Sequence, residues 1–493
     1  MVHERKLGLL CCAFQLRPVT TNSVKPEHFG EMKKLKKKDY LEKQRRHRLA
    51  HELDRRARRK ARKRQGFKVP PQLPSSHYKR EHAVMAFLRS RFRGKNLARY
   101  DLASGRWILG IPKIFSLISN PEETLDTINS IVTISHNKQI KSLFLDYSVC
   151  EDIDLGASAI LDMVVSYLRD EWVTLPGRSI LAGVLPNDER LNKILLCTGI
   201  TKSLSIKGME PPRHMEEELV RFPLFKGRRK SGSQLVGRQD RDEAASQMVS
   251  YVDGCLAKGA GYKLSDDGKR QILKWAGELI TNAEEHSGHD EWYAIGYMAP
   301  LGAVATQKSD FPIGECRFTV FGFGKSIYES LSGIGTSETK DQISKLVAVH
   351  TRKGWFGRKE RFSPQDLWTL YALQDGVSRF NLIPGGQSRG KGTVEMIEAF
   401  QELGKTLDDR GKPEMVLISG STRIYFDEIF HLRERGDRMI IAFNDNNDLE
   451  EKPDSDHVHS LTGYFPGTVL SMRFFIDKRY LDKHQPGTTK GRV

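Results

Sequence analysis

Several features that commonly organise a protein are scarce or missing in this chain of 493 residues. Its six cysteines form no C-x-x-C pair and lack the spacing of zinc ligands, which argues against a structural zinc site. Four of them stand singly in otherwise globular sequence, a pattern that fits reduced thiols. No apolar run approaches the roughly 18 residues of a membrane span, and the stretch 7–14 is too short and lacks a clear signal-peptide cleavage site. We therefore expect a cytoplasmic protein that does not cross a membrane.

Two familiar motifs of phosphate chemistry are also missing. A phosphate-binding loop of the form G-x-x-x-x-G-K-[ST] ending at Gly324, Lys325 and Ser326 would need glycine at position 319, where the chain has Thr319. The His-Glu-Leu triplet at 51–53 looks superficially like the phosphoacceptor box of sensor histidine kinases. It is flanked by arginines instead of lying on an apolar dimerisation helix. The sequence therefore predicts neither a P-loop enzyme nor a sensor kinase.

The positive charge is concentrated near the N-terminus. Residues 33–64 contain 17 lysines and arginines against four acids, a net charge of +13, whereas the whole chain carries +17. The surrounding stretch 32–65 lacks proline and glycine, and it predicts a solvated basic helix or a disordered arm. Such an arm can bind nucleic acid or another polyanion through phosphates, or simply increase solubility. Prolines between residues 66 and 80 then indicate a linker.

The stretch 81–205 contains strand and helix patterns at short spacing, which indicates a small α/β layer domain. Its LFLDYSVCEDIDLGASAIL and GVLPNDERLNKILLCTGI segments resemble the STAS domain of anti-sigma-factor antagonists. Where that family carries a phosphorylatable serine, this chain has residues 154–157, Asp-Leu-Gly-Ala, and Ser158 is out of register. We therefore expect an interaction or packing module without a phospho-switch. The expected elements are a strand at 143–146, a helix at 157–168, a strand at 179–185 and a helix at 187–197 that Gly199 ends.

Residues 206–240 are rich in glycine, serine and charge and predict a second linker. A helix is expected from Asp242, and another carries the stretch 275–287, WAGELITNAEEHS. Within that stretch a carboxylate, an amide and an imidazole recur every four residues, which places them along one helix face. The same pattern also suits an ordinary solvated stripe. The three residues are Glu278, Asn282 and His286.

Later segments give this polar stripe a context. Strands are expected at 292–298 and 315–321, followed by GFGKSIYESL at 322–331, a helix at 365–376, SRGKGTVEMIEAFQELG at 388–404, a strand at 415–419 and PGTVLSMRFFI at 466–476. In this order the segments resemble the Asn-containing helix, first glycine box, lid, second glycine box and Gly-Thr turn of the GHKL superfamily, which includes gyrase, chaperone, histidine-kinase and mismatch-repair ATPases. The resemblance extends over about 240 residues. It implies a Bergerat fold.

The resemblance also implies ATP and Mg²⁺ as ligands. Asn282 would ligate Mg²⁺, and an amide oxygen suits this hard cation. Glu278 would act as general base on water or on a hydroxyl nucleophile, and His286 would line the nucleotide or the lid. Glycines that open a helix let backbone N–H groups approach phosphate, although a plain glycine turn is the other reading. The implied nucleotide-binding residues are Asn282, His286, Gly322, Gly324, Lys325, Ser326, Arg389, Gly390, Lys391, Gly392 and Thr393.

One departure concerns the base. GHKL proteins use the aspartate of the first glycine box to accept a hydrogen bond from the exocyclic amine of adenine, and this chain has Gly322 there. Ser326 replaces a later glycine of the same box. Either another group reads the base, or base selectivity is reduced, or the site is degenerate. Two functions remain: a Mg²⁺-dependent ATP-binding protein with ATP hydrolysis or serine-kinase-like phosphoryl transfer in a bacterial-type regulatory system, and a non-catalytic regulatory scaffold that binds a polyanion through its arm.

The expected fold class is α/β, or α+β. Protein partners are expected at the STAS-like module, and nucleic acid or another polyanion at residues 32–65. The expected organisation is an unassigned N-terminus at 1–31, a basic helix or disordered arm with its linker at 32–80, a small STAS-like α/β domain at 81–205, a linker at 206–240, a two-layer Bergerat α/β sandwich with a mixed sheet at 241–480 and a tail at 481–493.

Overall fold

The structure is a computed structural model. All described residues belong to one compact unit, Met1–Cys12 together with Glu81–Val493. The expected basic arm and the proline-rich linker after it lie outside the described residues. The structure describes residues 9–11, 83–103, 106–136, 142–173, 180–199, 219–228, 234–286, 291–300, 313–332, 338–351, 362–375, 377, 392–403, 412–436 and 438–477.

The first sheet contains five of the described strands, in the order β1-β7-β5-β3-β2. Strands β3, β5 and β7 are parallel neighbours, whereas β1 and β2 are antiparallel at the two edges. Parallel neighbours need long crossover connections, and α3 and α4 supply them here. The strands are β1 (Leu9–Cys11), β2 (Arg99–Asp101), β3 (Arg106–Gly110), β5 (Ser142–Asp146) and β7 (Ile180–Val184), and the helices around them are α2 (Ala83–Arg91), α3 (Pro121–Ser135), α4 (Leu155–Val173) and α5 (Glu189–Thr198).

Local sequence signals explain the helix ends in this sheet layer. Asp188 caps α5 by accepting hydrogen bonds from the N–H groups of Arg190 and Leu191, and Gly199 follows its last residue. Buried Asp154 accepts a hydrogen bond of 2.8 Å from the N–H of Ala157 at the start of α4. The two strands and two helices expected between residues 143 and 197 are therefore confirmed as β5, α4, β7 and α5.

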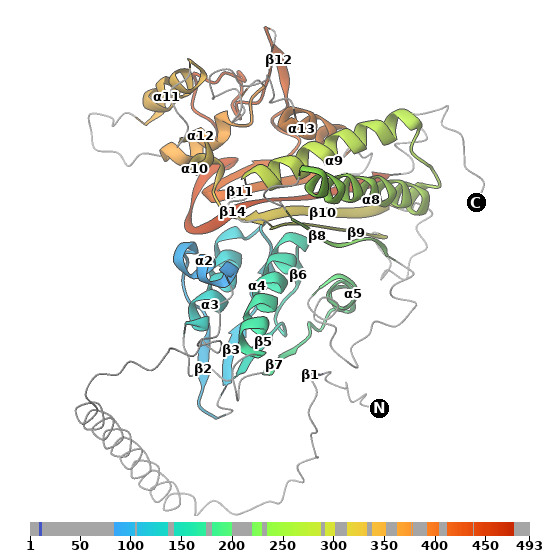
Figure 1. The fold of residues 1–493 in the computed structure, drawn as a ribbon, viewed down its shortest axis with the longest axis vertical. Coiled ribbons are helices and arrows are strands. Elements are labelled where there is room, and N and C mark those ends of the chain that lie inside the picture. Colours follow the sequence, from blue (N-terminus) through green and yellow to red (C-terminus); the bar gives the residue numbers. More distant parts are fainter. Residues whose placement is uncertain are drawn as a thin grey trace, which may run out of the picture. The chain divides into compact units, whose positions relative to one another are not determined.

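The second sheet has the order β11-β14-β10-β9-β8 (Figure 1). Every pairing described in it is antiparallel, so the expectation of a mixed sheet is wrong for this part of the chain. Strand β8 also lies inside the stretch 206–240 expected to be a linker. The strands are β8 (Val220–Arg228), β9 (Glu291–Pro300), β10 (Ile313–Phe323), β11 (Glu414–Phe426) and β14 (Val458–Asp477).

Helices cover one face of the second sheet. A hydrophobic cluster joins Tyr251 of α8 and Ile280 of α9 to Phe318 and Leu470 in the sheet. Helix α8 begins eight residues before the expected Asp242, and α9 contains the whole Glu278–His286 stripe. The helices on or near this face are α8 (Gln234–Ala260), α9 (Asp266–His286), α10 (Ile327–Ser332), α11 (Glu338–His350), α12 (Pro364–Tyr371) and α13 (Gly392–Leu403).

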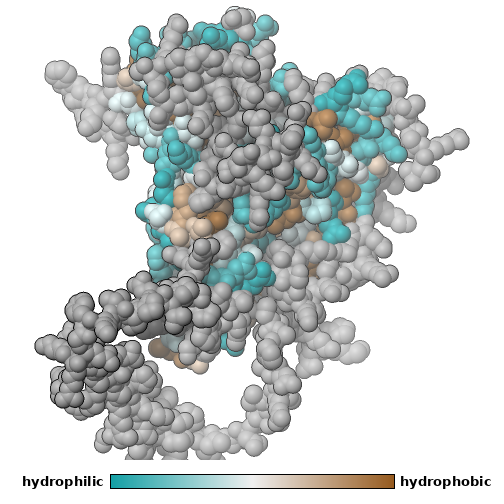
Figure 2. Space-filling view, in the orientation of Figure 1, coloured by the Kyte–Doolittle hydropathy of each residue, from teal (hydrophilic) through white to brown (hydrophobic). Residues whose placement is uncertain are grey.

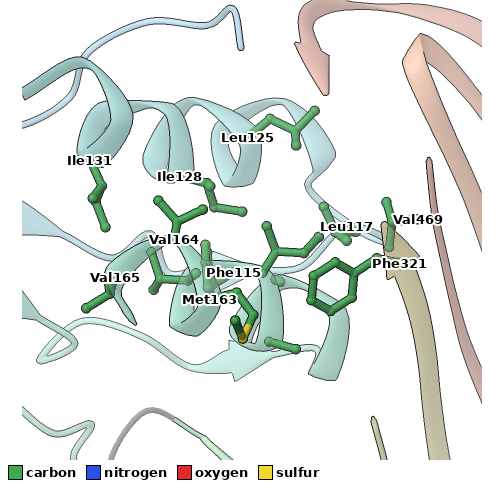
Figure 3. Packing of buried hydrophobic residues seen from close by; sticks show 14 of the residues in the cluster. Phe115, Leu117, Leu125, Ile128, Ile131, Met163, Val164, Val165, Phe321 and Val469 are labelled. Carbon is green, nitrogen blue, oxygen red and sulfur yellow. The ribbon is translucent and has the colours of Figure 1, made fainter. Parts of the chain in front are cut away.

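The opposite face of the second sheet is buried as well, against the first sheet layer. Phe321 and Val469 belong to the same hydrophobic cluster as Leu117 and the helices α3 and α4. Figure 3 shows Leu117 beside these two sheet residues. Helix α4 consequently has buried residues on nearly all sides. The second sheet therefore has a hydrophobic layer on each face, with helices on one side and the first sheet layer on the other. This is one layer more than a two-layer sandwich has.

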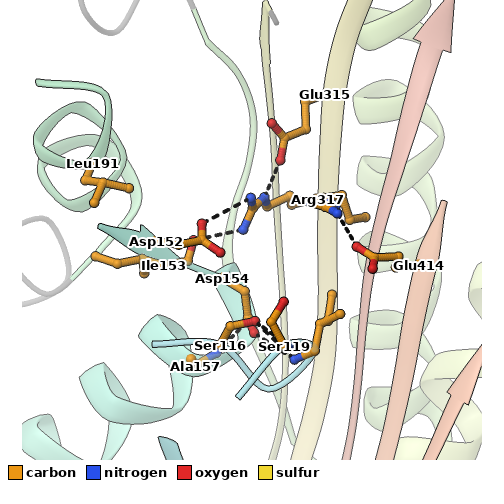
Figure 4. Close-up of polar contacts among 12 residues, drawn as sticks. Ser116, Ser119, Asp152, Ile153, Asp154, Ala157, Leu191, Glu315, Arg317 and Glu414 are labelled. Atoms are coloured by element: carbon orange, nitrogen blue, oxygen red, sulfur yellow. Dashed lines mark hydrogen bonds and ion pairs between the residues drawn. The ribbon is translucent and has the colours of Figure 1, made fainter. Parts of the chain in front are cut away.

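A buried arginine adds polar contacts to this shared core. Arg317 of β10 donates a hydrogen bond of 2.8 Å to the carbonyl oxygen of Ile153, in the two-residue strand β6 (Asp152–Ile153) that pairs with β4 (Ile114–Phe115). It forms ion pairs with Glu315 at 2.7 Å and with Asp152 at 3.8 Å (Figure 4). Although burial alone would lower it, Tyr297 and Glu315 raise the pKa of Arg317, so the guanidinium stays charged.

Hydrophilic and hydrophobic described residues both reach the surface (Figure 2). In the space-filling view, hydrophilic residues surround a smaller number of hydrophobic ones on the face drawn (Figure 2). A short hairpin of β12 (Arg433–Arg435) and β13 (Arg438–Ile440) is exposed on most of its residues. No helix among the described residues is both long enough and apolar enough to cross a bilayer. Together the elements make a protein of mixed α/β class, consistent with α+β.

Candidate functional site

The expected site residues of α9 lie near one end of the second sheet. The helix ends at His286, and β9 begins only five residues later, at Glu291. The next residue, Trp292, pairs with Gly322 at the other side of the β9–β10 ladder. The last turns of α9 and the first glycine box therefore lie at the same end of the sheet. The side chains of Glu278, Asn282 and His286 lie outside the described residues, and only their helical backbone is described.

A row of small and polar residues crosses the sheet at this end. Strand pairing sets Gly322 opposite Thr468 of β14, and Thr468 opposite Ser419 of β11. Alternation along β14 puts Thr468 on the same face as Leu470, which packs against the helices. The two hydroxyl groups lie 2.8 Å apart and share a hydrogen bond. The helix-covered face thus ends in hydroxyls next to a glycine, where an apolar core would have continued with larger side chains.

The Gly-Thr turn fits closely against the first glycine box. Gly467 has a φ of +144°, and a Cβ atom placed there would lie 2.0 Å from the carbonyl oxygen of Gly322. Such a distance is far inside van der Waals contact, so only glycine allows the two strands to approach in this way. Gly324 adds a backbone hydrogen bond of 2.9 Å to the carbonyl oxygen of Pro466. These glycines therefore have a structural task that does not depend on a ligand.

Ser326 starts a helix. Its backbone N–H donates to Glu329 Oε2 at 2.9 Å, and its Oγ accepts from the N–H of Glu329 at 3.2 Å. This reciprocal pair is a capping box at the N-terminus of α10. The N–H of Ile327 donates to Ser419 Oγ at 2.8 Å, which ties the turn to β11. Lys325 is exposed between these fixed residues.

Glu329 also binds an arginine of helix α2, far earlier in the chain. Arg91, the last residue of α2, forms an ion pair with Glu329 and donates to the hydroxyl of Tyr464 at 3.1 Å. Burial opposes ionisation of Glu329, but hydrogen bonds from Ser326 and Tyr464, with the charge of Arg91, together lower the pKa of its carboxyl. Arg91 and Glu329, which are 238 positions apart in the chain, thus together hold the turn at 322–326 in place. No sequence pattern pointed to Arg91.

The second glycine box is only partly described. Residues 389–391, which include the expected phosphate ligands Arg389, Gly390 and Lys391, lie outside the described residues. The described part of helix α13 starts at Gly392, with Thr393 next. Its expected apolar face is confirmed where it is described, because Val394, Ile397 and Phe400 are buried.

The segment that resembles the STAS phosphorylation site is packed inside the protein. Asp154 and Ser158 are both buried. A Cβ atom on Gly156 would lie 2.9 Å from Ser471 Oγ of β14, so the backbone at this point touches the second sheet. Burial alone raises the pKa of Asp154. The arrangement agrees with a packing module and leaves no exposed hydroxyl at the position of the family's phosphoserine.

Comparisons with protein-family models, with curated proteins and with solved structures found no match to this chain. Among the residues that the structure describes, no group of three or more histidine, cysteine, aspartate or glutamate side chains is placed to hold a metal ion. The side chain of Asn282, the residue to which the resemblance assigns Mg²⁺, lies outside the described residues. The described part of the candidate site therefore consists of a helix end, two glycine turns and the row of hydroxyl side chains between them.

Proposed function

We propose that this chain binds ATP with Mg²⁺ and uses it for hydrolysis or for phosphoryl transfer of the serine-kinase type. The observation that carries the proposal is the meeting of three segments at one end of the second sheet. These are the last turns of α9, the turn 322–326 and the Gly467–Thr468 turn. They are far apart in sequence and stand in the order typical of the GHKL superfamily. A common packing motif would not require all three.

The proposal assigns separate tasks to the residues. Asn282 would provide the amide oxygen for Mg²⁺, and Glu278, one turn earlier, would take the proton from the attacking hydroxyl or water. The backbone N–H groups that open α13 would face the phosphates, with the positive end of the helix dipole behind them. At the base, Gly322 offers no carboxylate, and the hydroxyls of Thr468 and Ser419 occupy the neighbouring positions of the row.

Thermal unfolding tests this function directly. Mg²⁺ with ATP at a hundred times its Kd should stabilise the fold by about 2.7 kcal/mol, which raises Tm by about 3 °C for a compact unit of this size. Asn282→Ala should abolish the rise. Leu273→Ala, an exposed position on the same helix, is the matched control and should keep it. Absence of any rise in the parent protein at millimolar ATP, GTP and ADP would refute nucleotide binding.

A second set of measurements separates catalysis from binding. Glu278→Gln should keep the ATP-induced rise in Tm but lose phosphate release or phosphoryl transfer, because the amide cannot accept the proton. Retained turnover in this variant would show that another group acts as the base. A protein that binds ATP without any turnover, with or without partners, would fit a nucleotide-gated scaffold.

The non-catalytic scaffold is the second candidate, and Gly322 is the observation that favours it. In that case the function would lie in polyanion binding by the arm at residues 32–65, whose net charge is +13. Deleting the arm should then remove salt-sensitive binding to nucleic acid. Full retention of that binding without the arm would exclude this version of the scaffold.

A further inference from the structure

The folded part of the chain contains a second basic segment. Residues 93–106 carry four basic side chains and one acid, a net charge of +3. With the +13 of residues 33–64, they account for all but one unit of the formal charge of +17. The rest of the protein is therefore almost neutral. Unlike the arm, this segment can be placed on the structure, where it forms the edge strand β2 and the loop that leads into it.

The loop before β2 has a fixed backbone. The N–H of Lys95 donates to Asp126 Oδ1 at 2.7 Å, and the N–H of Leu97 donates to Ser130 Oγ at 2.7 Å, both on α3. Arg93 exchanges two backbone hydrogen bonds with Tyr464 of β14. These bonds hold the main chain and leave the long side chains directed outward. The basic groups are thus presented on a rigid support.

The cations of this edge are not neutralised by acids. The guanidinium of Arg93 donates only to the backbone carbonyl oxygens of Phe92 and Ser90. The exposed side chains of Lys95 and Arg99 form no ion pair or hydrogen bond with any residue in the described part of the chain. Positive charge without an internal partner is available for an external anion.

An aromatic pair, one exposed ring and one partly buried ring, lies at Arg99 on this edge. Tyr100 is 50 % exposed and is paired with Trp107 of β3 across the ladder. Their ring centroids are 5.7 Å apart at an interplanar angle of 56°. Successive side chains of a strand point to opposite faces, so Tyr100 and Arg99 lie on the two sides of the edge. A chain that follows this edge would meet rings on one side and positive charge on the other.

We propose that this basic-aromatic edge (Arg93, Lys95, Arg99, Tyr100 and Trp107) binds single-stranded nucleic acid. Its phosphates would contact the three cations, and an unpaired base would stack on Tyr100. Duplex DNA offers phosphates but no free base face, and an acidic peptide offers charge without a flat ring. The combination of cations with an exposed ring therefore selects the single strand. The surface does not depend on the nucleotide site proposed above.

The test uses the full chain and a fluorescent 25-nucleotide oligo-dT, with anisotropy measured over a range of salt concentrations. In the variant Arg93→Ala/Lys95→Ala/Arg99→Ala, the slope of log K against log salt should become shallower by about two, because each lost contact to a single strand removes about 0.7. Tyr100→Ala should weaken binding about fivefold to a hundredfold with an unchanged slope, as expected for a lost stacking contact.

The matched control is Arg433→Ala/Arg438→Ala/Lys452→Ala, three exposed cations of which the first two lie on the β12–β13 hairpin. It removes the same charge and should leave the slope as it is in the parent protein. Equal slopes in the edge variant and the control would overturn the proposal, since the arm would then account for all binding. Competition by poly-glutamate at equal charge, or unchanged affinity in Tyr100→Ala, would also overturn it.

Because all the changed side chains are exposed, the Tm of each variant should equal that of the parent protein. If the Tm of the triple variant falls, the milder Lys95→Gln/Arg99→Gln variant replaces it, with an expected slope change of about 1.4.

Discussion

Removing Arg317 should show whether the first sheet layer and the second sheet unfold as one unit. In Arg317→Ala, the carboxylate of Glu315 keeps its burial but loses its close cation, and the carbonyl oxygen of Ile153 loses its donor. Breaking a buried ion pair by removing one partner costs about 3–5 kcal/mol. We therefore expect the free energy of unfolding to fall by that amount in urea titrations followed by fluorescence and circular dichroism, with both signals changing together.

The neighbouring arginine provides the control. Arg473 lies directly opposite Arg317 in the β10–β14 ladder and pairs with Glu414, but its side chain is 32 % exposed. This pair is more exposed than Arg317–Glu315, so Arg473→Ala should cost clearly less than Arg317→Ala. The double variant Arg317→Met/Glu315→Gln should recover part of the loss, because it removes the uncompensated carboxylate. Equal losses in Arg317→Ala and Arg473→Ala would refute the reasoning.

Three further predictions concern the second sheet and its loops. The imidazole of His457 lies 2.8 Å from Asp454 and 3.0 Å from Asp427, and these carboxylates raise its pKa although burial opposes the shift. The stability that the charged imidazole contributes is complete below the ordinary histidine pKa of about 6.5 and is lost as the pH rises through the raised pKa. His457→Gln should therefore lower the free energy of unfolding by about 1–3 kcal/mol at pH 5.5 and by clearly less at pH 8.5, and equal losses at both pH values in urea titrations would contradict this. Gly467→Ala should lower the free energy of unfolding by about 2–5 kcal/mol in the same assay, because the new Cβ atom strains the backbone and clashes with the carbonyl oxygen of Gly322. A loss below 1 kcal/mol would contradict the close approach of the two strands. Gly322→Asp should raise the preference for ATP over GTP about tenfold to a hundredfold in equilibrium binding, because a carboxylate accepts from the adenine amine, and unchanged selectivity in a folded variant would count against the proposed base position.

The sequence predicted those elements whose signals are local. A buried apolar run that ends on Asp146, helical spacing through Ile160 and Val164, and the stop at Gly199 were sufficient for β5, α4 and α5. These patterns depend on side-chain periodicity and on capping, and both act within a few residues. For the same reason, four of the five strands of the second sheet, β9, β10, β11 and β14, were identified even though their partners are far away in the chain.

Strand β8 was missed for an identifiable reason. Its sequence contains Pro223, Lys226 and Gly227, which read as a linker, and its pairing with β9 shifts register between Phe222 and Phe225. Proline is tolerated in a sheet at an edge strand, and β8 is the edge of this sheet. The alternation that would have indicated a strand is interrupted at the bulge. Only the tertiary pairing reveals the strand.

The identity of residue 326 could have been explained from the sequence. Ser326 followed by Glu329 is the S-x-x-E signature of a capping box, so serine at this position signals a helix start. The contact of Arg91 with Glu329 could not have been found in this way. It joins α2 to α10 over 238 residues and follows no periodic pattern.

This long-range contact changes how the first glycine box is understood. The turn at 322–326 is held by its own helix cap, by the close approach of Gly467 and, through Glu329, by Arg91. Each of these fixes backbone geometry, and none of them needs a carboxylate at position 322. Glycine at position 322 is therefore compatible with a well-formed turn, and in the proposed nucleotide site it would affect only the reading of the base. Under the proposed function, affinity for the phosphates and selectivity for the base should therefore vary independently, whereas a site with a collapsed turn would lose both.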